Sequence, residues 1–215
     1  MTAIEEPTRR PSDRRCAILQ EVSDALRMAN DGATSIEAFL AGTSVSQREV
    51  IDEFGSMDDL VIALVENIVA FMLEPLDESP TEATFMRQLV AYGRRVTDEY
   101  ADLRLKNLYR IAITDTIRDS RMKGEFYRRG PHVVQSELAR FFRSAQLAGV
   151  RLDLDSRRLA GHFMAYLRVG WDLSGTGPQA DGSQPADGVG RRVEGFLKGI
   201  RPESNDACTA VHDQR

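Results

Sequence analysis

The residues whose side chains are best suited to chemistry lie in a short run between Ser46 and Phe54. Gln47 and Arg48 carry the amide and guanidinium groups that pair with the edges of adenine and guanine in the major groove of DNA. Ser46 stands directly before them, where a hydroxyl caps a helix and the helix N-terminus attracts a phosphate. This spacing indicates recognition of nucleic acid.

The charge of the same region opposes that interpretation. Arg48 is the one basic residue between residues 46 and 59, where the acidic residues are Glu49, Asp52, Glu53, Asp58 and Asp59. A carboxylate ~4 Å from a phosphate is repelled by about 1 kcal/mol in bulk water and by about 4 kcal/mol at an effective dielectric of about 20. Specific DNA binding exceeds non-specific binding by about 4–10 kcal/mol, so a few such contacts would offset it. Two outcomes stay open: Glu49 reads a cytosine amino group, or the acidic side chains point away from DNA.

Four helices are predicted around this run, in the order of a helix-turn-helix domain. Each has an apolar stripe at helical spacing and a Ser or Thr before its first turn. Their predicted limits are Ser12 to Asn30, Thr34 to Ala41, Ser46 to Gly55 and Ser56 to Pro75. The last of them begins with a variant capping box, in which Asp59 stands three residues after Ser56.

Helical periodicity continues through the rest of the chain, where few β-branched runs of period two occur. The predicted fold class is therefore all-α. Further helices are expected at about 81–100, 103–119, 124–148, 155–173 and 187–199. Gly130-Pro131 should break or kink the helix at 124–148, because proline removes a backbone donor. Residues 174–188 should form a Gly/Pro-rich loop.

Two segments carry a resemblance to a known family. Residues 34–60, TSIEAFLAGTSVSQREVIDEFGSMDDL, resemble the DNA-binding head of the TetR family of bacterial repressors. Residues 126–170, which begin FYRRGPHVVQ, are similar to the ligand-binding half of one TetR subfamily. The resemblance covers about residues 12–200. It implies an N-terminal three-helix helix-turn-helix domain and a C-terminal helical bundle for ligand binding and dimerisation.

The resemblance also implies which residues contact DNA. The family's contact positions correspond here to Thr34, Ser35, Ser46, Gln47 and Arg48. In addition, Arg14 and Arg15 belong to a basic stretch at residues 8–15, which we expect to enter a minor groove as an arm.

The recognition helix departs from the family pattern. The residues that replace the usual ones are Ser44 for Gly, Arg48-Glu49 for Gly-Thr, Ile51 for Tyr, Glu53 for His and Met57 for Lys. These departures favour an alternative hypothesis, a TetR-fold protein that no longer binds DNA and acts through a partner or a small ligand.

The expected domains are a disordered arm at 1–11, the DNA-binding domain at 12–58, the ligand-binding and dimerisation domain at 59–200 and a disordered tail at 201–215. The larger domain should hold a mostly apolar pocket with a few polar groups. The candidate ligand-binding residues are Met72, Tyr92, Tyr109, His132 and Trp171. By resemblance, helices 155–173 and 187–199 form the dimer interface, with candidate contacts at Leu159, Phe163, Tyr166 and Phe196.

No group of residues in the sequence supports catalysis or metal binding. His132, His162 and His212 have no metal-ligand spacing with one another or with Cys16 and Cys208. The sequence has no Gly-rich phosphate loop and no nucleophile elbow. We therefore expect no catalytic residue, no metal and no cofactor.

The composition is that of an ordinary globular protein, with 42% hydrophobic residues, 28% charged residues and a net charge of −5. No apolar run approaches the roughly 18 residues of a membrane span, and a secretory signal is lacking, so we expect a cytoplasmic protein without membrane contact. The expected function is that of a homodimeric TetR-like regulator. It would repress at a palindromic DNA operator and be released by a small apolar or amphipathic effector.

Overall fold

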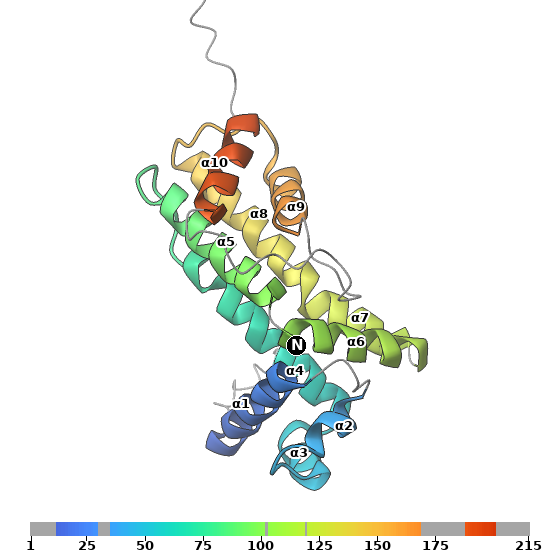
Figure 1. The fold of residues 1–215 in the computed structure, drawn as a ribbon. Coiled ribbons are helices and arrows are strands. Elements are labelled where there is room, and N and C mark those ends of the chain that lie inside the picture. Colours follow the sequence, from blue (N-terminus) through green and yellow to red (C-terminus); the bar gives the residue numbers. More distant parts are fainter. Residues whose placement is uncertain (1–11, 30–34, 102, 119, 169–187, 201–215) are drawn as a thin grey trace, which may run out of the picture. The chain divides into compact units, whose positions relative to one another are not determined.

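The computed structural model describes residues 12–29, 35–101, 103–118, 120–168 and 188–200, which are mostly helical and contain no strand (Figure 1). The predicted all-α fold is confirmed. The helices are α1 (Asp13–Met28), α2 (Ile36–Leu40), α3 (Gln47–Phe54), α4 (Met57–Leu73), the 3₁₀ helix η1 (Glu74–Leu76), α5 (Phe85–Ala101), α6 (Leu103–Arg118), α7 (Ser120–Arg129), α8 (Pro131–Leu147), α9 (Ser156–Leu167) and α10 (Gly188–Ile200). The predicted arm, the tail and residues 174–187 of the predicted loop lie outside the described residues.

Local signals set the limits of the first three helices. The Ser12 hydroxyl caps α1 by accepting from the Arg15 N–H at 3.0 Å, as predicted. Ser35 caps α2, one residue later than predicted, and Thr34 lies outside the described residues. Ser46 caps α3, as predicted, and Gly55 ends it with φ +97°, a conformation that favours glycine.

A second pair of serine and acidic residues begins α4. The Asp59 N–H donates to the Ser56 hydroxyl at 3.1 Å, and that hydroxyl donates to Asp59 Oδ2 at 2.6 Å. The capping pair predicted from the sequence is therefore present, although the carboxylate accepts from the serine side chain instead of its backbone. The helix continues to Leu73, where η1 follows and contains Pro75.

Gly130 separates α7 from α8, so the predicted break at Gly130-Pro131 is confirmed. A Cβ atom at Gly130 would lie 2.9 Å from the Phe126 carbonyl oxygen and 3.1 Å from Cγ1 of Val65. The nearer atom is a backbone oxygen of the preceding turn of α7, which a larger residue would have to displace, and Val65 of α4 leaves little further room. Glycine therefore fits this position best.

The chain divides into two compact units, which we describe separately. The head unit contains the described residues within 1–72 and 98–133, and in it α1 contacts α2, α3 and α6. The aromatic unit contains the described residues within 73–97, 134–170 and 178–215. The head unit is thus larger than the DNA-binding domain predicted at 12–58, and the limits of the functional domains stay a prediction.

The core of the aromatic unit is a cluster of packed rings. Phe163 is at its centre, with ring centroids 4.9 Å from Phe196, 6.0 Å from Phe142 and 6.2 Å from Tyr92. Phe142, Phe163 and Tyr92 are fully buried. Aromatic pairs at these separations contribute beyond their buried area, so this cluster joins α5, α8, α9 and α10 strongly.

Candidate DNA-recognition site

The two sides of α3 have different environments. Val50 and Phe54 are 0% and 9% exposed and pack into the core of the head unit. Arg48 and Asp52 are exposed on the opposite side, and Gln47 is exposed at the first position of the helix. With 100° of rotation per residue, Glu49 and Glu53 project in a third direction and are only half exposed.

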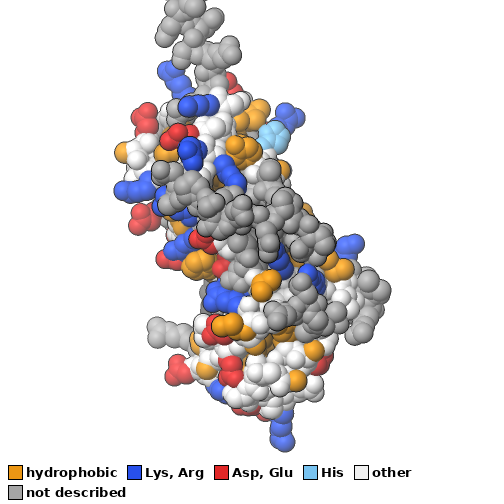
Figure 2. Space-filling model, viewed as in Figure 1, with side chains coloured by type: hydrophobic (Ala, Val, Ile, Leu, Met, Phe, Trp, Pro, Cys, Tyr) orange, Lys and Arg blue, Asp and Glu red, His pale blue; other side chains and the backbone are white. Residues whose placement is uncertain are grey.

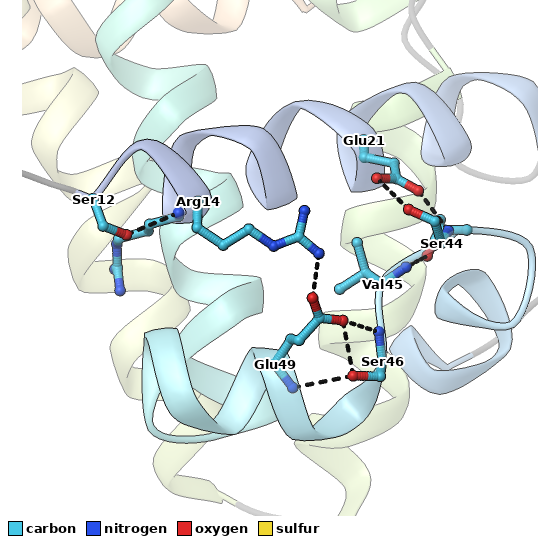
Figure 3. A network of polar contacts seen from close by, with 9 residues as sticks. Ser12, Arg14, Glu21, Ser44, Val45, Ser46 and Glu49 are labelled. Atoms are coloured by element: carbon cyan, nitrogen blue, oxygen red, sulfur yellow. Dashed lines mark hydrogen bonds and ion pairs between the residues drawn. The ribbon is translucent and has the colours of Figure 1, made fainter.

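Glu49 completes a capping box at the start of its own helix (Figure 3). The Ser46 N–H donates to Glu49 Oε2 at 2.9 Å, and the Glu49 N–H donates to the Ser46 hydroxyl at 3.2 Å. The Ser46 hydroxyl also donates to Glu49 Oε2 at 2.8 Å. This arrangement satisfies two N–H groups that helix geometry leaves without an acceptor.

Arg14 of α1 forms an ion pair with the other carboxylate oxygen of Glu49 (Figure 3). The backbone and side-chain hydrogen bonds from Ser46, followed by that of Arg14, lower the pKa of Glu49 from 4.5 to about 2. Glu49 is therefore ionised in the folded head unit over the whole physiological range. Its charge is directed at Arg14 and at the helix N-terminus.

Glu53 and Arg15 connect the end of α3 to α1 in a similar way. Ser12 donates from its hydroxyl to Glu53 Oε2 at 2.6 Å. Arg15 donates to the Glu53 carbonyl oxygen at 2.6 Å, and its guanidinium lies 4.0 Å from the centre of the Phe54 ring. Arg14 and Arg15 thus belong to the first turn of α1, in contact with α3, and not to an extended arm.

These contacts account for most of the acidic residues that opposed DNA binding in the sequence. Glu49, Glu53 and Asp59 each accept at least one local hydrogen bond. Within α3, which the structure describes completely, Asp52 is the single fully exposed carboxylate. On the face that Figure 2 shows, acidic and basic side chains of the described residues are interspersed.

The turn between α2 and α3 is held by a residue of α1 (Figure 3). Glu21 accepts from the backbone N–H of Ser44 and, at 3.0 Å, from its hydroxyl. These bonds lower the pKa of Glu21. Ser44 replaces the glycine usual at this turn, and its hydroxyl is one of the two groups that fix the turn to α1.

Asn107 connects α6 to the end of α1 within the head unit, a role that the sequence analysis did not identify. Its side-chain amide is buried and donates to the carbonyl oxygens of Leu26 at 2.8 Å and Ala29 at 3.3 Å. These carbonyls lie at the C-terminal end of α1, where no helical N–H follows. The available signal was a lone amide among apolar positions of α6.

A buried ion pair between Glu99 and Arg104 was also missed. It joins the end of α5 to the start of α6, and both side chains are buried. Oε2 of Glu99 is buried without a hydrogen-bond partner among the described residues. The two residues are five apart, whereas neighbours on a helix surface are three or four apart, so helical spacing does not predict the pair.

The candidate ligand-binding residues have different environments. Tyr92 is buried in the aromatic unit, and Met72 is buried in the head unit. Tyr109 is half-buried in the head unit with its ring 5.0 Å from that of Phe126. His132 is exposed and stacks on the exposed Tyr127 at 6.1 Å, so it does not line a buried pocket in this unit. Trp171 lies outside the described residues.

The candidate dimer contacts differ in the same way. Leu159 and Phe163 are fully buried, and Phe196 is 8% exposed, so these side chains already pack inside one protomer. Tyr166 is exposed on α9, with its ring 6.0 Å from that of Phe196. Of the four, Tyr166 is the one with substantial surface for a second copy.

Two other kinds of site are absent from the described part of the chain. None of its helices combines the length and the hydropathy of a membrane span. It also contains no cluster of three or more His, Cys, Asp or Glu side chains placed to hold a metal ion.

Comparisons with known proteins agree with this architecture. Residues 87–197, more than half of the chain, match the family model of the AefR-like transcriptional repressor C-terminal domain. No curated protein matches the sequence significantly. A solved structure described as a TetR-family regulator from Mesorhizobium loti MAFF303099 is 18% identical with a TM-score of 0.63, over 90% of this chain and 99% of that one. GusR from Salmonella enterica is 19% identical with a TM-score of 0.61, over 90% of this chain and 100% of that one.

A third solved structure, the flavonoid-responsive regulator FrrA, is 19% identical with a TM-score of 0.57, over 88% of this chain and 100% of that one. Regulators of this kind bind operator DNA, form dimers, respond to small-molecule effectors and are generally not enzymes. Because residues 87–197 match this family model and the helices of the head follow the family's order, this chain belongs to the TetR family of transcriptional regulators.

Proposed function

We propose that this protein represses transcription as a homodimer that binds a palindromic operator through α3 and is released by a small apolar or amphipathic effector. The observation that carries the proposal is the separation of charge around α3. Glu49 and Glu53 are engaged by residues of α1 and by Ser46, whereas Gln47 and Arg48 are exposed. Glu49 and Glu53 therefore stabilise the head and do not cover its reading surface.

Phosphate binding at α3 would use backbone groups. The capping box occupies the N–H groups of Ser46 and Glu49. Those of Gln47 and Arg48 lie in the first turn, where helix geometry provides no acceptor, and they carry the positive end of the helix dipole. By resemblance to the family, Ser35 contributes its hydroxyl at the start of α2, and Thr34 has the same expected role.

The direct test is selection of binding sites from a random duplex pool at low salt. We expect an enriched palindrome and an affinity that falls steeply with salt, because phosphate contacts release counterions. Arg48→Ala should lower affinity and relax the preference at one base pair, by about 1–3 kcal/mol. Gln20→Ala, a change at an exposed residue of α1, serves as the matched control.

A specific observation supports the alternative of a TetR fold without DNA binding. Asp52 is exposed next to Arg48, where its charge would approach a phosphate or a base. The alternative predicts no enriched sequence from a folded dimer. It also predicts that Asp52→Asn creates sequence-independent affinity for DNA that the unchanged protein lacks.

The dimer interface is proposed on the exposed side of α9. Tyr166→Asp should shift the protein to monomers in sedimentation equilibrium, because a charge would be buried in the two-fold contact. Phe163→Asp is not a suitable test, since Phe163 is buried in the core of the protomer. A Tyr166→Asp variant that remains dimeric would place the interface elsewhere.

The effector site is proposed beside α6, with Tyr109 as the polar group of its lining. FrrA is described as flavonoid-responsive, so a flavonoid is a reasonable first amphipathic probe for this chain. Release of the selected DNA by the probe, weakened by Tyr109→Phe, would support the assignment. A probe that stabilises the protein without releasing DNA would contradict effector control.

A further inference from the structure

Ile51 is an apolar side chain in an otherwise polar and exposed surface. It is 54% exposed in the middle of α3, whereas Val50 and Phe54 of the same helix are buried in the core. Packing therefore does not require an isoleucine at this position.

The position of Ile51 relates it to the proposed base-reading side chains. Residues three and four apart lie next to each other on a helix surface, so Ile51 is adjacent to both Gln47 and Arg48. All three are exposed on the described surface of α3. A major groove that accommodates Gln47 and Arg48 would also accommodate Ile51.

The major groove offers one apolar group among the four bases, the C5-methyl group of thymine. We propose that Ile51 is a specificity-determining residue that packs against the methyl group of a thymine in each operator half-site. This inference rests on the proposed DNA binding through α3. It predicts the identity of one base in each half-site, a thymine adjacent to the bases that Gln47 and Arg48 contact.

A contact with a second copy of the chain fits Ile51 less well. The charged residues Arg48 and Asp52 flank it and are exposed. The centres of protein interfaces are depleted of charged residues, and a single isoleucine offers little apolar area. DNA provides hydrogen-bond acceptors for Arg48 beside the thymine methyl group, which matches this mixed surface.

The test removes the methyl group from DNA without changing base pairing. In the selected operator, each thymine is replaced in turn by deoxyuridine, symmetrically in both half-sites, and the dissociation constant is measured. At one position per half-site we expect the affinity to fall roughly 4-fold for each buried methyl group. The Ile51→Ala variant should bind the original operator more weakly and show no further loss on deoxyuridine replacement.

Two variants serve as controls. Ile51→Val retains a branched side chain and should keep the sensitivity to deoxyuridine, whereas Arg48→Ala should bind more weakly but still distinguish thymine from deoxyuridine. Equal affinity for all deoxyuridine operators, with specific binding intact, would overturn the role of Ile51 and leave the proposed function in place. Failure to select any operator would overturn both. A change in oligomeric state of Ile51→Ala by light scattering would assign Ile51 to a contact between copies.

Discussion

The α1–α3 part of the head unit and the aromatic unit are stabilised by different contacts. In the head, polar side chains of α1 hold α3 and the turn before it, as Arg14 does with Glu49 and Glu21 with Ser44. In the aromatic unit, rings such as Phe142 and Phe163 pack face to edge with no exposed surface. Exposed ion pairs contribute about 0–1 kcal/mol each, whereas a buried aromatic side chain contributes several.

Because of this difference, substitutions in the two regions should have different effects on stability and on DNA binding. Substitutions in the aromatic unit should lower the free energy of unfolding without altering the chemistry of α3. Substitutions among the polar contacts around α3 should lower stability less than those in the aromatic unit, and should change DNA binding more, because these contacts orient α3.

The largest effect is expected for Phe163→Ala. Removing this fully buried ring leaves a cavity in contact with Tyr92, Phe142 and Phe196, which should lower the free energy of unfolding by about 3–5 kcal/mol. Urea denaturation measures the change. Tyr166→Ala on the exposed side of α9 is the control and should cost far less within a protomer. A cost below about 1 kcal/mol for Phe163→Ala would contradict the described core.

A smaller effect is expected at the connection between α6 and α1. Asn107→Ala removes both hydrogen bonds to the end of α1 and should cost about 1–3 kcal/mol, since buried carbonyl groups lose their donor. Hydrogen exchange should show faster opening of the last turn of α1. Thr114→Ala on the same helix removes only a bond to the Arg110 carbonyl and should leave α1 unchanged. Equal exchange in the two variants would refute the connection.

The cap of α3 comes next. Ser46→Ala removes the acceptor for the Glu49 N–H and should cost about 1 kcal/mol. The same change should weaken operator binding, because the first turn of α3 loses its fixed orientation. Ser46→Thr keeps the hydroxyl and should restore most of both losses. Operator affinity that is unaffected by Ser46→Ala would show that the cap does not orient the reading surface.

The smallest expected effect is a loss of stability of the head unit at acidic pH. Glu49 has a folded-state pKa of about 2 against an ordinary 4.5, so its contribution is present above pH ~4.5 and is lost as the pH falls towards 2. The pKa of Glu21 is lowered in the same unit and that of Glu74 in the aromatic unit. Hydrogen exchange between pH 5 and 2 should therefore show the head loosening first. Glu49→Gln should reduce this dependence, and an unchanged profile would contradict the pairing.

Much of the fold was predictable because its signals are local. Ser12, Ser46 and Gly55 mark helix ends through contacts within four residues. The geometry of the helix determines such contacts, so they do not depend on distant parts of the chain. Gly130-Pro131 was likewise sufficient to place the break between α7 and α8. The predicted end of α1 at about Asn30 and cap of α2 at Thr34 differ by one or two residues from the observed Met28 and Ser35, as expected where helix ends fray.

The sequence by itself determined the all-α class, most caps and the TetR-like order of the head helices. Only the tertiary structure decided that Glu49 faces Arg14, that Phe163 is core and that Asn107 caps α1. The partners in these contacts are 35 or more residues apart, except where Phe163 meets Phe142 and Phe196. Helical spacing fixes which residues share one side of a helix. What each side meets depends on how the helices pack, and that depends on the apolar surface of the whole unit at once.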